Sequence, residues 1–376
     1  MLAFQSRVLH FTFETASVYI HPLLVTRYLI FMRVSFLLSP EFIPKADWHE
    51  ALEKGDVLQV ASLGIAATAQ NMIYQTWFWL HEAGVACDLV HTLPQEGIVI
   101  FISTTFSPCT VLPPQLFYVD VLADTMLLPI THFHLIQNQA KARWTPHALF
   151  VPHWPQPSLI PRDPTRGSRL EKISFFGDPD NLAPELQTPE WISQLRRELG
   201  MFLDFKENKR WHDYSDTDVV LAIRDFSQSP HYHKPATKLY NAWLADVPFI
   251  GGRDSAYAID GRPGIDYLVA TSPQQVIDHL RHLKEDVALR QQLVARGRES
   301  RAAFSRETIV LQWKQLIEET LPALAEKWEK KSSLQQHLFW MTQKCSYFFD
   351  LYFKKTNRDE VLLEKTIPGI KEYLQQ

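Results

Sequence analysis

The stretch that decides the fold runs from His231 to Arg253 and reads HYHKPATKLYNAWLADVPFIGGR. Pro235 suits the first turn of a helix, and residues 236–245 are compatible with a helix. Pro248 then begins a short apolar run that ends at two glycines, which is typical of a buried strand. The sequence therefore predicts a helix, a tight turn and a strand, in this order.

The predicted helix carries positive charge where helices usually carry negative charge. Lys234, Lys238 and Asn241 follow at intervals of four and three residues, so they share one face. His231 and His233 join the two lysines near the helix N-terminus, where the macrodipole is already positive. A bound phosphate or diphosphate stabilises such an arrangement. A solvated face of lysines is the other interpretation, and charge alone leaves both open.

The run KPATKLYNAWLADVPFIGG, with DSAY after it and Trp313 further on, resembles the carboxy-terminal half of glycosyltransferases with the GT-B fold. The likeness is to the group-1 or family-4-like set and extends as a two-domain pattern over residues 33–320. It implies an α/β fold of two doubly wound, Rossmann-like domains that face one another across a cleft. It also implies that the second domain holds a nucleotide-sugar donor and the first holds the acceptor.

The resemblance assigns a set of donor-binding residues, with one departure. Many family-4 enzymes carry two glutamates eight positions apart, whereas the matching positions here hold His233 and Asn241. Neither side chain supplies a fixed negative charge, so the donor-binding mode differs. After the predicted strand, a loop from Asp254 to Tyr257 is expected to contact a sugar ring through hydroxyls and carboxylates, and Tyr257 can stack on the ring. The expected donor-binding residues are His233, Lys234, Thr237, Asn241, Asp254, Ser255, Ala256 and Tyr257.

Two cations are expected to act on the leaving group. Family-4 enzymes often place an arginine and a lysine after the glycine that ends the first strand of this domain, but the loop here, residues 178–181, is acidic. Arg224, which directly follows an uninterrupted apolar run, and Lys238 are the replacement that we expect. A forked guanidinium and a point charge together suit a diphosphate. A salt bridge from Arg224 to Asp225 or Asp254 is the alternative.

The first domain is predicted to be a parallel sheet, because short apolar runs alternate with helices or long crossovers. Ligands gather beyond the carboxyl ends of such strands. Asp124 follows one of these runs, and its carboxylate can orient or deprotonate an acceptor hydroxyl. A turn or helix cap is the alternative role for Asp124. The other residues expected near this edge are Ser39, Ser103, Thr104 and Asn138.

Composition excludes several classes of protein. A net charge of −4 and a pI near 6.4 give no overall basic field, which argues against nucleic acid as the main partner. Cys87, Cys109 and Cys345 are widely spaced and form neither a disulfide framework nor a zinc site. They indicate a reducing compartment, so we expect a cytoplasmic protein. His132 and His134 lack an accompanying carboxylate cluster, and no metal site is predicted.

The domain boundaries come from changes in composition. Arg27 and Arg33 interrupt the apolar N-terminus, which is predicted to be neither a membrane span nor a secretory signal; an amphipathic arm in contact with a membrane is the alternative. Six prolines between residues 144 and 167 indicate a semi-rigid connection. The predicted segments are an uncertain extension over 1–31, an acceptor-side domain over 32–158, a donor-binding domain over 159–320 and a helical extension over 321–376.

The helical extension carries an apolar stripe. Such a helix either docks on another surface or lies at a membrane interface, with lysines flanking the apolar residues. The resemblance implies a final helix that returns to the first domain, so docking is expected and peripheral membrane contact is the alternative. The stripe consists of Leu334, Leu338, Met341, Cys345, Phe348 and Tyr352.

The function expected from these features is a hexosyltransferase that moves a sugar from a nucleotide sugar to a hydroxyl of a sugar, glycan or glycolipid. Cations and a helix N-terminus would stabilise the departing diphosphate, so neither a metal nor a cofactor is required besides the donor substrate. The resemblance implies retention at the anomeric carbon. A nucleotide-sugar-binding or scaffolding subunit, and an epimerase or hydrolase on the same fold, are the alternatives.

Overall fold

The computed structural model describes residues 32–39, 50, 71–122, 124–207, 210–227 and 229–356, without the side chains of residues 71 and 353–356. The predicted N-terminal extension, residues 1–31, lies outside this part of the chain. So does the end of the predicted C-terminal extension. The elements from Val34 to Thr356 all belong to one compact part of the chain.

The first sheet has six strands, all parallel, in the order β2-β1-β3-β4-β5-β6. Its two central strands, β3 and β4, are buried along nearly their whole length, as the continuous apolar runs predict. The strands are β1 Val34–Leu37, β2 Asp88–Val90, β3 Gly97–Ile102, β4 Leu116–Leu122, β5 Phe133–Ile136 and β6 Ala148–Phe150.

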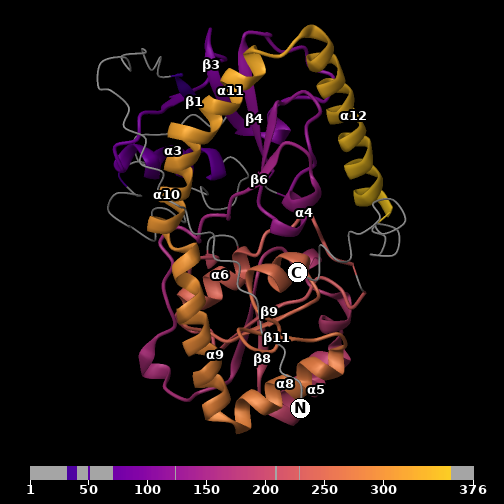
Figure 1. The fold of residues 1–376 in the computed structure, drawn as a ribbon. Helices are drawn as coiled ribbons and strands as arrows, with labels where there is room; N and C mark the ends of the chain where they lie inside the picture. Colours follow the sequence, from indigo (N-terminus) through magenta and orange to yellow (C-terminus); the bar gives the residue numbers. More distant parts are fainter. Residues whose placement is uncertain are drawn as a thin grey trace, which may run out of the picture. The chain divides into compact units, whose positions relative to one another are not determined.

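The second sheet has five strands, again all parallel, in the order β11-β10-β9-β7-β8. Two parallel sheets with interleaved helices confirm the predicted α/β fold of two doubly wound units (Figure 1). The first unit contains the six-stranded sheet, and the second unit contains the five-stranded sheet. The strands are β7 Lys172–Phe176, β8 Phe202–Lys206, β9 Val219–Ala222, β10 Phe249–Gly251 and β11 Leu268–Val269.

Helices join the strands and cover the sheets (Figure 1). Helix α5 shows how the sequence sets their ends: the Thr188 side chain accepts a hydrogen bond from Trp191 N, and Gly200 follows with φ 61°. The helices are α3 Asn71–Glu82, α4 Gln139–Trp144, α5 Pro189–Leu199, α6 Thr237–Leu244, α7 Ser255–Asp260, α8 Pro273–Glu285, α9 Val287–Ser300, α10 Arg306–Gln315, α11 Leu321–Glu329 and α12 Ser333–Thr356.

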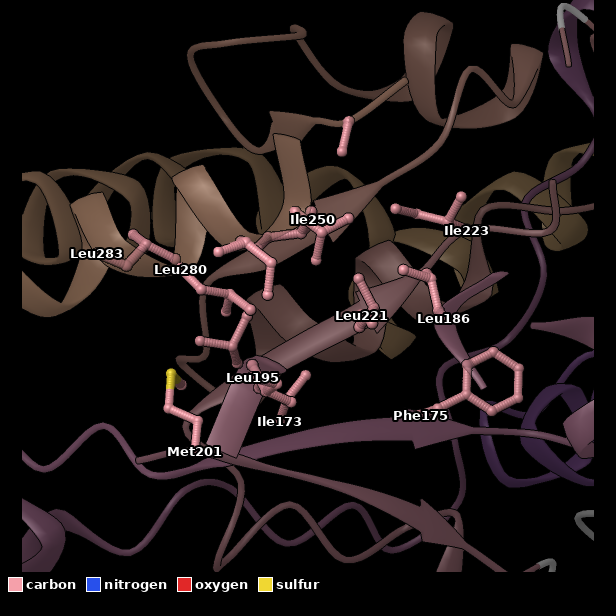
Figure 2. Packing of buried hydrophobic residues seen from close by; sticks show 14 of the residues in the cluster. Ile173, Phe175, Leu186, Leu195, Met201, Leu221, Ile223, Ile250, Leu280 and Leu283 are labelled. Carbon is pink, nitrogen blue, oxygen red and sulfur yellow. The ribbon is translucent and has the colours of Figure 1, made fainter. Parts of the chain in front are cut away.

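One core cluster fixes the second sheet. Side chains of the central strands, Ile173 and Leu221 among them, pack against Leu195 of α5 and Leu280 of α8 (Figure 2). These four side chains are fully buried. Burial of each such side chain stabilises the fold by about 1.5–3 kcal/mol. The carboxyl ends of β7, β9 and β10 are thereby held in fixed positions.

Two local predictions were wrong. The proline-rich connection was expected to begin at Trp144, but residues 148–150 form β6, which pairs with β5 at the edge of the first sheet. An edge strand tolerates nearby prolines because one side needs no ladder hydrogen bonds. The segment from Asp254 to Tyr257 was expected to be a loop, but residues 255–260 form helix α7.

The C-terminal elements return to the first sheet, as the resemblance implied. Helix α10 packs on α3, α11 contacts β3, and Gln343 of α12 donates a hydrogen bond to Thr131 O. The face by which α12 packs differs from the predicted one. Phe339, Gln343 and Asp350 are buried, whereas most of the predicted stripe is exposed. In the described part of the chain, no helix is both long and apolar enough to cross a membrane.

Candidate functional site

Two segments at the carboxyl edge of the second sheet carry the candidate cations, and a third segment borders them. Arg224 comes two residues after the end of β9, the turn at Gly177 follows β7, and Lys234 and Lys238 lie just before and within α6. Gly177 has φ 148°, and a Cβ there would lie 3.5 Å from Lys238 Cε. The glycine therefore gives the backbone a conformation that other residues rarely adopt, and this turn lies directly beside the Lys238 side chain.

Arg224 forms the salt bridge that was its alternative role. Its Nε donates to Asp254 Oδ2 at 2.8 Å, and both side chains are largely buried. The two terminal nitrogens of Arg224 have no hydrogen-bond partner among the described residues. The salt bridge therefore fixes the guanidinium from one side and leaves the outer fork available to a ligand.

Lys238 has no carboxylate at ion-pair distance in the described part of the chain. Its Nζ lies 5.4 Å from the centroid of the Phe175 ring, a cation–π contact. Burial, and next the positive charge of Arg224, lower the pKa of Lys238 to about 8. The folded protein therefore stabilises the charged form of Lys238 less well than water does.

The first sheet adds a carboxylate next to these cations. Lys234 Nζ lies 3.3 Å from Asp124 Oδ2, and the aspartate side chain is half exposed. Asp124 has φ 61°, in the left-handed region. The electrostatic influence of Asp124 and Asp254 also reaches Lys238. Two carboxylates thus stand among three cations, so the cluster keeps a net positive charge.

The first turn of α6 has no capping side chain. The N-terminal N–H groups of a helix lack intrahelical partners, so they are available to an acceptor from outside. Thr237 Oγ1 is buried there without a hydrogen-bond partner among the described residues. Both features lie one residue from Lys238.

Asn138, at the end of β5, joins the two α/β units beside the cluster. Its Oδ1 accepts from Lys141 N and caps α4. Its Nδ2 donates to Lys234 O at 3.0 Å and to Ser255 Oγ at 2.9 Å. One buried side chain thus holds the start of α6 and the start of α7 against the first unit.

His233 faces the first unit and α12. Its Nδ1 lies 3.0 Å from Lys141 Nζ, and its Nε2 lies 3.6 Å from Asp350 Oδ1. Asp350 also pairs with Lys141 Nζ at 2.8 Å and accepts from Leu127 N. The predicted donor contact of His233 remains a prediction, and the structure gives this side chain a role in joining three elements.

Three other predicted donor residues point into packing contacts. Asn241 is buried, and its Oδ1 accepts from Gln156 N at 2.9 Å. Ala256 and Tyr257 are buried, and the Tyr257 ring packs edge-on against Phe249. Asn241 therefore lies on a face of α6 that the segment at Gln156 covers.

Two residues essential to this arrangement were missed by the sequence interpretation. Lys141 and Asp350 are 209 residues apart and almost fully buried as a pair. A lone aspartate within an aromatic helical run was the only signal for Asp350. Among the described residues, no group of three histidine, cysteine or acidic side chains has the geometry of a metal site.

No protein-family model and no curated protein matches the chain. Solved structures resemble it at low identity. HepE from Anabaena, solved with UDP, is 12% identical with a TM-score of 0.47, over 78% of this chain and 100% of that chain. AviGT4, a glycosyltransferase involved in avilamycin A biosynthesis, is 14% identical with a TM-score of 0.45, over 77% and 98%.

Sucrose-phosphate synthase from Thermosynechococcus elongatus is also similar, at 13% identity and a TM-score of 0.44, over 60% of this chain and 74% of that chain.

Proposed function

We propose that this protein transfers a sugar from a nucleoside-diphosphate sugar to a hydroxyl acceptor. The observation that carries the proposal is Lys238, a partly buried ammonium group beside Arg224 with no carboxylate partner among the described residues. A buried charge without a partner is costly, and an anionic ligand removes that cost. A diphosphate fits because two cations and an uncapped helix start lie together.

The proposed chemistry is stabilisation of a leaving group. As the bond between the sugar and the diphosphate breaks, negative charge develops on the diphosphate oxygen. The outer fork of Arg224 and the ammonium of Lys238 would face that charge, with Asp254 holding the guanidinium in place. The cations supply the positive charge that a divalent metal provides in other enzymes, so we propose that the reaction is metal-independent.

We propose that Asp124 orients the acceptor hydroxyl. Its carboxylate lies beside Lys234 and is half exposed, so it is accessible to a substrate. A carboxylate at this position can orient a hydroxyl and accept its proton. We also propose that the transferred sugar retains its configuration at the anomeric carbon.

A panel of nucleotide sugars tests the function directly. Each donor is incubated with the full chain, with and without sugar and glycolipid acceptors, in buffer with excess chelator. Release of nucleoside diphosphate that requires an acceptor supports a transferase, and the anomeric configuration of the product follows from its NMR spectrum. Release without any acceptor favours a hydrolase, and binding without release favours a donor-binding subunit. Activity that stops in chelator contradicts the roles of Arg224 and Lys238.

A further inference from the structure

Helix α12 exposes a row of large apolar side chains. Among the described residues, eleven large apolar side chains stand out as exposed, and five of them lie on one face of this helix. The row extends over about 27 Å at 1.5 Å per residue. Its members are Leu334 at 68% exposure, Leu338 at 54%, Met341 at 52%, Phe348 at 65% and Tyr352 at 47%, with Cys345 also exposed.

The opposite face of α12 is firmly attached to the first unit. Gln343 Nε2 donates to Thr131 O at 2.7 Å and approaches His134 Nε2 at 3.1 Å. Asp350, two helical turns further along, pairs with Lys141. Phe339 packs near His132 between these anchors and the start of the helix. The exposed row therefore lies on the side of α12 that faces away from these buried contacts.

Charge on this helix has one sign at the surface. Lys344 is exposed and flanks the apolar row, and the sequence continues with Lys354 and Lys355. The only acidic residue in the sequence of α12 is Asp350, which is buried and neutralised by Lys141. An apolar face with only basic charges beside it is complementary to a surface that is apolar inside and negative outside.

We propose that the outer face of α12 binds the surface of an anionic lipid bilayer. The apolar row enters the boundary between headgroups and acyl chains, where Phe348 and Tyr352 suit the interface. Lys344 contacts the negative headgroups. The proposal rests on α12 alone and is independent of the proposed transfer reaction.

A second copy of this chain is the competing occupant, because spacings of four and three also mark a coiled-coil seam. The residues beside the seam argue against it. They include Lys344 and no acid, so two copies form no salt bridge across such a seam. Phe348 and Tyr352 are also larger than the aliphatic residues that two-stranded seams favour.

Sedimentation with vesicles tests the proposal. The full chain is mixed with vesicles of phosphatidylcholine alone or of phosphatidylcholine with phosphatidylglycerol. We expect binding to the anionic vesicles that weakens with added salt. A triple variant, Leu338→Gln with Met341→Gln and Phe348→Gln, should bind at least about tenfold less tightly. Leu311→Gln, which changes an equally exposed leucine of α10, should bind like the parent.

Melting curves show whether the triple variant folds, which we expect because the three side chains are exposed. If it melts early, Lys344→Glu decides instead, and it should reduce binding to anionic vesicles without affecting the melting curve. Equal binding by the parent and by the folded triple variant overturns the proposal. The proposal is also overturned if the parent does not bind anionic vesicles but forms a dimer, measured by light scattering, and the triple variant does not.

Discussion

Buried charge is paired at one edge of the second sheet and lacks a pairing carboxylate at the other edge, among the described residues. At the amino edge, Asp218 has a fully buried side chain and accepts from Arg162 and Arg166. It also accepts from the backbone N–H groups of Glu171 and Lys172. At the carboxyl edge, Lys238 is partly buried beside Arg224, and no carboxylate among the described residues pairs with it.

The difference separates a structural charge cluster from a binding one. Around Asp218 every strong acceptor position is used, which fixes the start of β7 and of β9. Around Lys238 positive charge is in excess, which makes the folded chain less stable than a neutral version would be. A charge that lowers stability at a strand's carboxyl end is typical of a ligand site.

The largest effect is expected at the amino edge. Asp218→Ala removes the carboxylate and leaves Arg162 and Arg166 facing one another without a counter-ion. We expect the free energy of unfolding to fall by about 3–5 kcal/mol, measured by urea denaturation. The folded fraction should bind nucleoside diphosphate as the parent does, because the change is at the far end of the strands. A loss below 1 kcal/mol would show that this cluster is not structural.

At the carboxyl edge, the expected effect is on binding and not on stability. Lys238→Met keeps the length of the side chain and removes its charge. Affinity for nucleoside diphosphate, measured by calorimetry, should fall about tenfold or more, since a charge-assisted contact is worth about 1.5–3 kcal/mol. The free energy of unfolding should stay unchanged or rise, because an unpaired cation is lost.

Matched lysines control for the Lys238 experiment. Lys330→Met removes an exposed lysine that pairs with Glu326, so it should alter neither affinity nor stability. Lys234→Met should weaken binding less than Lys238→Met, because Lys234 already has Asp124 as a partner. Unchanged affinity in the folded Lys238 variant would remove the main support for a diphosphate site.

The smallest expected effect is a dependence on pH. Burial and Arg224 lower the pKa of Lys238 to about 8 from its usual 10.5, so the free protein loses this proton as pH rises through 8. Affinity for diphosphate should then decline by at most about tenfold per pH unit. The folded state binds fewer protons than the unfolded state between pH 8 and 10.5, so the penalty on stability is complete below 8 and declines across that window.

Calorimetry at several pH values above 7 measures this slope, and Lys238→Met provides the comparison. The variant should bind weakly at every pH with little change above pH 8. Equal slopes for parent and variant would mean that another group titrates there.

Much of the fold could be predicted because buried parallel strands are short apolar runs with glycine or polar residues after them. The runs at residues 98–102 and 219–222 are shorter than a typical helix and apolar throughout, as strands buried on both faces are. β6 could not be predicted, because its three residues carry no periodic pattern and their pairing with β5 decides the conformation.

The C-terminal helix was predicted with the wrong face inward. Periodicity identifies the apolar stripe, but docking on the first unit depends on what that unit presents. There it presents His134, Thr131 O and Lys141, and polar side chains of α12 match them better than the stripe does. Burial of Gln343 and Asp350 therefore decided the orientation.

The candidate site was predictable only where its residues are close in sequence. Lys234 and Lys238 share one segment, and Arg224 ends a recognisable strand. The contacts of Asn138 with Lys234 and Ser255 span about a hundred residues, and no local pattern encodes them. Asn241 was correctly predicted to lie on a helix but wrongly expected on its open face, because helical spacing does not reveal which face a neighbouring segment covers.

Asp350 connects three parts of the molecule. Its carboxylate contacts Lys141 of the first unit and His233 of the segment that leads into α6, and it belongs itself to the terminal helix. If the second unit rotated away from the first, His233 would lose its contact with this carboxylate, whereas α12 would keep its ion pair with Lys141. The last helix therefore joins the first unit to the residues that precede Lys238.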